Sequence, residues 1–258
     1  MWRVWVLGLI QGLTEFLPIS SSGHLIVLKN WFSLLAPGAS LEVALHLGTL
    51  MAIIIGYRQE LALWIHHCLQ GQVAARRLVY QVLFGTVPAA ALGYFFEARV
   101  VSYFIPTAVI GGWLVTSLLL WLTPTPTSTP HRALESLSFW EALAIGIMQS
   151  LALWPGLSRS GSTIFMGRIF RLSPEASAQF SFYLAIPVMC GAFVLTWWRH
   201  PLQHPFSTPF AVSGTILSAI AGLFAIKWVQ SALKRPRVWR RFGLYTFGMA
   251  LLTWWLGG

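Results

Sequence analysis

The chain has 258 residues, of which 56 % are hydrophobic and only 9 % are charged. A soluble domain of this size carries many more charged surface residues, so the composition excludes an ordinary soluble fold. The formal net charge of +10 would indicate a nucleic-acid partner in a soluble protein. Here the basic residues lie mostly between apolar runs, so membrane topology explains them and we expect no nucleic-acid partner.

The first predicted element, at about residues 2–28, is a membrane helix that is interrupted part-way. Its apolar residues run into QGLTEFLPISSSGHLI at 11–26, which holds a proline, a glycine and a run of hydroxyl groups. Pro18 ends a helix there, because proline lacks a backbone donor and restricts the preceding residue. We therefore expect a broken-helix hairpin that enters and leaves the membrane on one face.

Three apolar runs follow, each about as long as the 17–25 residues that cross a bilayer. They predict transmembrane helices at 41–57, 79–96 and 105–122. The stretch 123–138 is rich in proline, threonine and serine, which predicts a polar cytoplasmic linker. The linker separates a first half at 1–122 from a second half at 139–258.

The second half repeats this plan. Its broken segment, at about 139–170, contains QSLALWPGLSRSGSTI at 149–164, which aligns without gaps to 11–26. Because an odd number of spans separates the copies, the second half must lie upside down relative to the first. The predicted fold is an all-α integral membrane protein built as an inverted repeat, each half being one re-entrant broken-helix hairpin plus three transmembrane helices. The second set of spans is predicted at 176–197, 209–230 and 242–257.

Basic residues predict how this multi-pass chain is oriented. We assume that each broken segment leaves the membrane on the same face by which it entered. The face that holds the termini then carries four basic loop residues, Arg3, Lys29, Arg99 and Arg199. The opposite face carries eleven, namely Arg58, Arg76, Arg77, Arg132, Arg168, Arg171, Lys234, Arg235, Arg237, Arg240 and Arg241. Cytoplasmic loops carry an excess of Lys and Arg, so both termini are predicted to be periplasmic.

The two interruptions are the predicted functional site, because paired breaks in two hydrophobic halves mark binding sites near the bilayer midplane. In the first copy, Gln11 and Glu15 lie one helical turn apart on one face. An ionisable residue inside a membrane is a functional candidate by default. The break then exposes hydroxyl and backbone N–H groups that favour an anion. Its polar residues are Ser20, Ser21, Ser22 and His24.

The second copy carries a different charge. Leu153 stands at the position of Glu15, and Arg159 opens the next helix among hydroxyl groups. Guanidinium forks match phosphoryl oxygens, so Arg159 is predicted to clamp a phosphate. The residues predicted to bind phosphoryl oxygens are Ser20, Ser22, Ser158, Arg159, Ser160 and Thr163.

Two interpretations stay open for the flanking polar residues. Glu42 and His46 lie i, i+4 at the start of the first span; they either support the site from behind, together with Gln11, or form a pair near the membrane surface. Arg159 either clamps phosphate or pairs with Glu15 across the two tips, and the two roles are compatible.

The two motifs resemble those of the undecaprenyl-diphosphate phosphatase family (UppP/BacA). That family combines an (E/Q)xxxE segment that runs into a Ser/His turn with a PGxSRSxxT segment. They stand here as QGLTEFLPISSSGH at 11–24 and PGLSRSGST at 155–163. EVALHLGTLMA at 42–52 and FSFYLAIPVM at 180–189 are also similar, so the resemblance covers essentially the whole chain. Gln11 stands where many members have Glu.

The resemblance implies an enzyme of the bacterial inner membrane that hydrolyses undecaprenyl diphosphate to undecaprenyl phosphate and inorganic phosphate. This reaction recycles the lipid carrier of peptidoglycan synthesis and underlies bacitracin resistance. The resemblance also implies a polyprenyl diphosphate lipid as substrate, a site that faces the periplasm, and a divalent metal, Mg²⁺ or Ca²⁺. Glu15 is the candidate metal ligand, with Gln11 as the second candidate. We expect membrane lipids to surround the chain. The sequence leaves open whether the protein forms a homodimer.

Within this expectation the catalytic residues are Glu15, Ser21, His24 and Arg159. Arg159 stabilises charge in the transition state, and Ser21 attacks phosphorus or positions water. His24 is the base or acid, or attacks phosphorus directly. Glu15 activates the attacking group or holds the metal. A transporter or flippase for undecaprenyl phosphate is the alternative, because inverted repeats with broken helices also build carriers.

Overall fold

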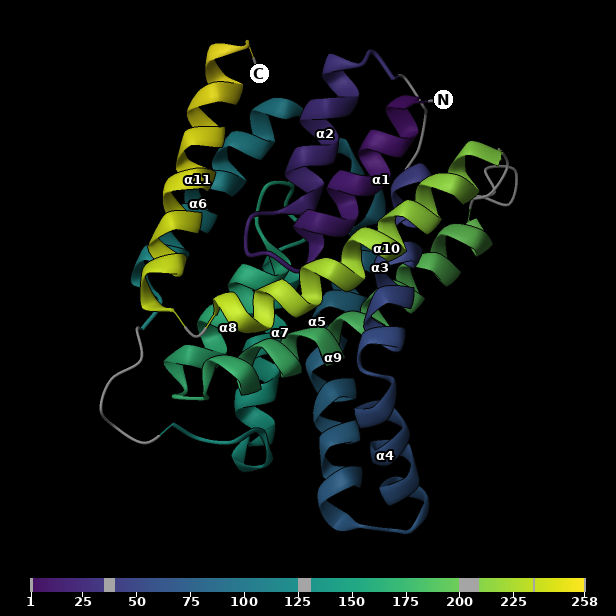
Figure 1. The fold of residues 1–258 in the computed structure, drawn as a ribbon, viewed down its shortest axis with the longest axis vertical. Coiled ribbons are helices and arrows are strands. Elements are labelled where there is room, and N and C mark those ends of the chain that lie inside the picture. Colours follow the sequence, from purple (N-terminus) through teal and green to yellow (C-terminus); the bar gives the residue numbers. More distant parts are fainter. Residues whose placement is uncertain (1, 35–39, 125–130, 200–208, 234, 258) are drawn as a thin grey trace.

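The protein is described by a computed structural model that covers residues 2–34, 40–124, 131–199, 209–233 and 235–257. Within these ranges it has eleven α-helices and one short 3-10 turn, η1 (Leu134–Ser136). Extended pairing in the described part is limited to an isolated bridge between Arg132 and Leu172. The predicted all-α class is therefore confirmed (Figure 1). Of the predicted linker 123–138, residues 125–130 lie outside the described residues.

Each of the two motifs forms a break between two helices. Ser20 and Ser158 cap the helices that follow the breaks: their hydroxyl groups accept hydrogen bonds from Gly23 N at 3.3 Å and from Gly161 N at 3.1 Å. A serine at this position satisfies a backbone donor that has no partner inside the helix. The helices on either side of the breaks are α1 (Trp2–Glu15) with α2 (Ser21–Trp31), and α7 (Phe139–Leu151) with α8 (Arg159–Ile169).

A helix also lies at each of the six ranges that were predicted as spans. They are α3 (Ser40–Gly56), α5 (Val73–Ser102), α6 (Pro106–Leu122), α9 (Pro174–Arg199), α10 (Pro209–Ala232) and α11 (Pro236–Trp255), with α4 (Arg58–Leu69) between α3 and α5. In the described part of the chain, three helices, α5, α9 and α10, are by themselves long and apolar enough to cross a membrane. The number is four if α3 and α4, bent by 72°, form one span. A membrane protein is thus confirmed, whereas six full spans are not.

Glycine lets the broken helices cross the long helices closely. A Cβ atom on Gly8 of α1 would lie 2.4 Å from the carbonyl oxygen of Gly214 on α10. A Cβ atom on Gly146 of α7 would lie 2.0 Å from the carbonyl oxygen of Gly85 on α5. Backbones approach this closely in membranes only where small residues line the crossing. The two crossings therefore hold the broken segments against α10 and α5.

The first break packs against a long helix of the second half. Phe16, directly after Glu15, is fully buried and packs edge-on against Phe182 of α9, with ring centroids 5.4 Å apart. In Figure 1 the start of α1 and the end of α11 lie at one end of the molecule, and α4 lies at the opposite end. The breaks lie between these ends.

Candidate functional site

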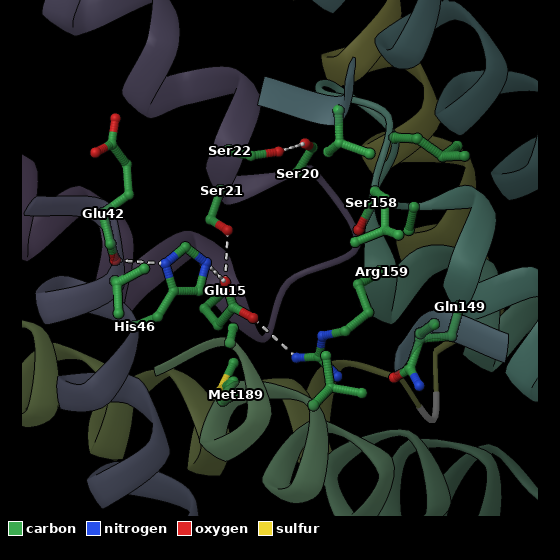
Figure 2. Close-up of a pocket in the computed structure, with 18 of the residues that line it drawn as sticks. Glu15, Ser20, Ser21, Ser22, Glu42, His46, Gln149, Ser158, Arg159 and Met189 are labelled. Carbon is green, nitrogen blue, oxygen red and sulfur yellow. Dashed lines mark hydrogen bonds and ion pairs between the residues drawn. The ribbon is translucent and has the colours of Figure 1, made fainter. Parts of the chain in front are cut away.

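A cavity of about 240 Å³ lies where the two breaks meet. Its wall combines hydroxyl and charged side chains from both motifs and from α3 with apolar side chains of α5 and α9 (Figure 2). The predicted site residues that line it are Glu15, Ser20, Ser21, Ser22, Glu42, His46, Ser158 and Arg159. The fold therefore brings most of the predicted site to one place.

Glu15 is the centre of the polar contacts in this cavity. Its Oε1 accepts a hydrogen bond from Arg159 Nη2 at 2.9 Å. Its Oε2 accepts from Ser21 Oγ at 2.5 Å and from Gln11 Nε2 at 3.0 Å. The Glu15 side chain is only 5 % exposed, and these neighbours all donate, as an ionised carboxylate requires. Glu15 thus links the two motifs.

Arg159 is held in place by two hydrogen bonds, and its Nε donor has no partner. Nη1 donates to the backbone oxygen of Ser181 at 3.0 Å, and Nη2 donates to Glu15. Nε is buried and has no hydrogen-bond partner. The ion pair with Glu15, one of the two interpretations of Arg159, is therefore present. The free N–H group leaves the guanidinium able to bind a further acceptor.

Glu42 and His46 form part of the cavity wall. His46 Nδ1 donates to the backbone oxygen of Glu42 at 2.7 Å, because a carbonyl oxygen can only accept. His46 Nε2 then faces Glu15 Oε2 at 3.5 Å. Glu42 Oε1 pairs with Lys29, while its Oε2 is buried and has no partner. Both side chains therefore line the cavity, and their role in supporting the site stays a prediction.

His24 is not among the residues that line this cavity. Its Nδ1 lies 2.6 Å from the backbone oxygen of Ser20, and its Nε2 lies 2.7 Å from the hydroxyl group of Tyr245. The ring also packs edge-on against Trp113. Because Nδ1 must donate to a carbonyl, Nε2 accepts from Tyr245. Both ring nitrogens are therefore engaged, and a catalytic role for His24 stays a prediction.

Three further predicted residues are buried around the cavity without lining it. Ser160 Oγ donates to the backbone oxygen of Leu17 at 2.9 Å, which ties the second break to the first. Thr163 Oγ1 donates to Ser181 Oγ at 2.7 Å. Gln11 is fully buried behind Glu15. In this structure they hold the walls together, and diphosphate binding by Ser160 and Thr163 stays a prediction.

One polar residue of the cavity wall was missed by the sequence analysis. Gln149 of α7 lines the cavity, and neither atom of its amide has a hydrogen-bond partner. The available signal was its alignment with Gln11 in the duplicated motif. Tyr245 of α11, the partner of His24, had no such signal.

The oxygen atoms near the cavity suit a metal ion only if phosphate oxygens of a substrate complete its coordination. Among the described residues, no group of three His, Cys, Asp or Glu side chains is placed to hold a metal. Glu15, the second oxygen of Glu42 and the buried, unbonded Oε1 of Gln11 are the acceptors near the cavity. Mg²⁺ is often bound by one or two carboxylates together with substrate phosphates, and these acceptors fit that kind of site.

Comparison with known proteins identifies the chain. Residues 4–252 match the family described as Bacitracin resistance protein BacA. This chain belongs to the BacA family. The match extends over both motifs and all of the helices that build the cavity, and it confirms the family resemblance seen in the sequence.

Several BacA relatives carry the name undecaprenyl-diphosphatase. The one from Rubrobacter xylanophilus is 38 % identical over 264 residues, which cover 96 % of this chain and 94 % of the relative. The one from Korarchaeum cryptofilum is 36 % identical and covers 96 % of this chain and 97 % of the relative. The one from Carboxydothermus hydrogenoformans is 34 % identical, with coverage of 96 % and 94 %. The chain is thus similar to these enzymes over nearly its whole length.

Proposed function

We propose that this protein hydrolyses undecaprenyl diphosphate to undecaprenyl phosphate and inorganic phosphate in the bacterial plasma membrane. The enzyme recycles the lipid carrier of peptidoglycan synthesis and confers bacitracin resistance. The observation that carries the proposal is the cavity in which Glu15, Ser21 and Arg159 meet, in a chain of the BacA family. The names of the relatives support hydrolysis and do not favour the transporter alternative.

The two halves form an inverted repeat, with the site open toward the periplasm. The glycine crossings support the repeat, since Gly8 and Gly146 occupy aligned positions and so do Gly214 and Gly85. Each broken segment crosses a long helix of the other half. The arginine-rich loops, on the face opposite the termini, support a cytoplasmic assignment for that face.

The diphosphate binds between the two breaks. Arg159 and the hydroxyl groups of Ser20, Ser22 and Ser158 hold phosphoryl oxygens, and Arg159 neutralises the charge that develops on them. Fixed donors in the low dielectric of a largely buried cavity are worth more than the same donors in bulk water. Positioning and charge neutralisation are most of what phosphoryl transfer requires of a protein.

Ser21 attacks the terminal phosphorus. Its hydroxyl proton passes to Glu15 Oε2, which lies 2.5 Å from Ser21 Oγ. The new Oγ–P bond forms as the anhydride P–O bond breaks, and undecaprenyl phosphate leaves. Water then attacks the phosphoserine, and inorganic phosphate is released with Ser21 restored. A water molecule oriented by Ser21 is the one-step version of the same displacement.

A divalent cation, Mg²⁺ or Ca²⁺, supplies charge neutralisation when it is bound. If Glu15 held the cation instead of accepting the Ser21 proton, it would be the main ligand, with Gln11 Oε1 and Glu42 Oε2 as acceptors close by. Hard cations prefer oxygen ligands of this kind, and they are commonly bound by carboxylates together with substrate phosphates.

The isoprenoid tail occupies an apolar groove that continues from the cavity. The groove has a volume of about 600 Å³ and lies between α5 and α9. Six residues line both the cavity and the groove, namely Val43, Ala89, Val100, Leu153, Val188 and Ala192. Gly93 and Gly191 leave open space along it, because a Cβ atom on either would meet nothing within 4 Å.

Filling the groove is expected to select against the long tail. Gly191→Phe lowers kcat/KM for undecaprenyl diphosphate by about tenfold, because the tail loses apolar contacts, and leaves the much shorter farnesyl diphosphate within about twofold. Gly248→Phe on α11 is the matched control, since its Cβ position is also open but lies outside the groove. The check is phosphate release from both substrates. An equal loss with both substrates would rule out the groove as the tail site.

The activity itself is tested by phosphate release from undecaprenyl diphosphate by purified protein in detergent. We expect release with Mg²⁺ or Ca²⁺ and none after EDTA, with recovery when the metal is restored. Release that resists EDTA would remove the metal from the proposal. If well-folded protein released no phosphate with either metal, the hydrolase proposal would be wrong. Lipid flipping in vesicles would then be measured.

A further inference from the structure

Gln149 is a buried polar residue that the folded protein leaves without partners. It is 2 % exposed and lines the cavity, and both its Nε2 and its Oε1 lack hydrogen bonds. Buried amides in native proteins are almost always hydrogen-bonded, because burial removes them from water. An unbonded amide on a cavity wall therefore points to a group that binds in the cavity.

The duplicated motif explains why this amide is left over. Gln11 holds the aligned position in the first copy, and its Nε2 donates to Glu15, four residues later. In the second copy the residue four positions after Gln149 is Leu153. The same amide on the same kind of helix has lost its internal acceptor, and it faces the shared cavity instead.

A second unbonded donor lies in the same part of the cavity. Arg159 Nε is buried and has no partner. Figure 2 shows the Arg159 side chain between Glu15 and Gln149, so Gln149 lies on the side of Arg159 away from the carboxylate. The Nε N–H group of Arg159 and the amide of Gln149 both lack a partner, and two such donors on one cavity wall suit a ligand made of anionic oxygens.

We propose that Gln149 is a substrate-binding residue, whose amide N–H donates to a phosphoryl oxygen of the diphosphate on the side of Arg159 away from Glu15. This inference rests on the proposed hydrolase function. It adds a residue from outside the segments 11–24 and 155–163 to the site. It also gives the second broken helix a direct contact with substrate ahead of its break.

Gln149→Leu tests the role, because leucine has a similar size and no donor. We expect kcat/KM for undecaprenyl diphosphate to fall by about 10- to 100-fold, the loss of one hydrogen bond to a charged group. The apparent Tm is expected to stay level or rise, because no internal hydrogen bond is lost. A lower Tm with unchanged kinetics would show a structural residue and overturn the inference, as would unchanged kinetics with an unchanged Tm.

Gln81→Leu is the matched control. Gln81 of α5 is also 2 % exposed, but its Nε2 donates to the backbone oxygen of Leu137 and it does not line the cavity. We expect this variant to lower the Tm and to keep the KM of the wild type. The same fall in kcat/KM in both variants would attribute the loss to folding and overturn the binding role.

A binding measurement separates this inference from the hydrolase proposal. The probe is the methylene-bisphosphonate analogue of farnesyl diphosphate, which cannot be hydrolysed at its bridge. We expect it to raise the Tm of the wild type, as a ligand of the folded state does, and to raise the Tm of Gln149→Leu much less. Equal shifts would overturn the inference. If the analogue raises the Tm of the wild type but the wild type releases no phosphate from undecaprenyl diphosphate, the hydrolase proposal is contradicted. The contact between Gln149 and a diphosphate is then still supported.

Discussion

Arg159→Ala is expected to lower kcat for undecaprenyl diphosphate by at least about 10²- to 10³-fold, the scale of losing one key transition-state donor. Arg159 is the one Arg or Lys side chain among the described residues that line the cavity. Without it, the charge that develops on the phosphoryl oxygens has no fixed cation beside it. The measurement is the steady-state rate of phosphate release at saturating substrate and metal.

Arg159→Lys separates charge from geometry. Lysine keeps the positive charge but lacks the planar fork that holds Glu15 and Ser181. We expect this variant to recover part of the activity that alanine removes. Thermal unfolding of both variants is needed, because removing Arg159 leaves the buried Glu15 with fewer donors, which destabilises by a few kcal/mol. A folded Arg159→Ala protein with nearly wild-type kcat would exclude the phosphate clamp.

Ser21→Ala is expected to abolish turnover, with a fall in kcat of about 10³-fold or more, because the attacking oxygen is removed. Ser21 Oγ is the hydroxyl group that donates to Glu15 in the cavity. Single-turnover formation of undecaprenyl phosphate measures the attack step directly. Ser22→Ala is the matched control: Ser22 lines the same cavity and lies 3.2 Å from Ser20 Oγ. We expect it to stay within about tenfold of the wild type.

His24→Gln completes this comparison. His24 is bonded to Ser20 and Tyr245 on the far side of the break, so we expect its loss to disturb the turn and to cost less than the loss of Ser21. If one of the two variants keeps substantial turnover, the residue that it replaces is not the attacking group. Strong activity in Ser21→Ala together with an inactive His24→Gln would transfer the nucleophile to His24.

Much of the fold follows from rules that act within a few residues. Pro18, and the serines three positions before Gly23 and Gly161, end one helix and begin the next by local hydrogen bonding. The apolar runs are long enough to predict helices at six ranges, and helices lie there. The number of full spans does not follow from composition: six were predicted, whereas three described helices, or four if α3 and α4, bent by 72°, form one span, are long and apolar enough to cross a membrane.

The sequence by itself determined that this is a helical membrane protein of the BacA family, and it predicted Glu15, Ser21 and Arg159 as site residues, which line one cavity in the structure. Only the tertiary structure decided that Glu15 and Arg159, 144 positions apart, share an ion pair. It also decided that His46 faces the cavity, that His24 turns to Tyr245, and that the Gln149 amide is left free. Motif spacing constrains neighbours along one helix, whereas the direction of a side chain between helices depends on how distant segments pack around it.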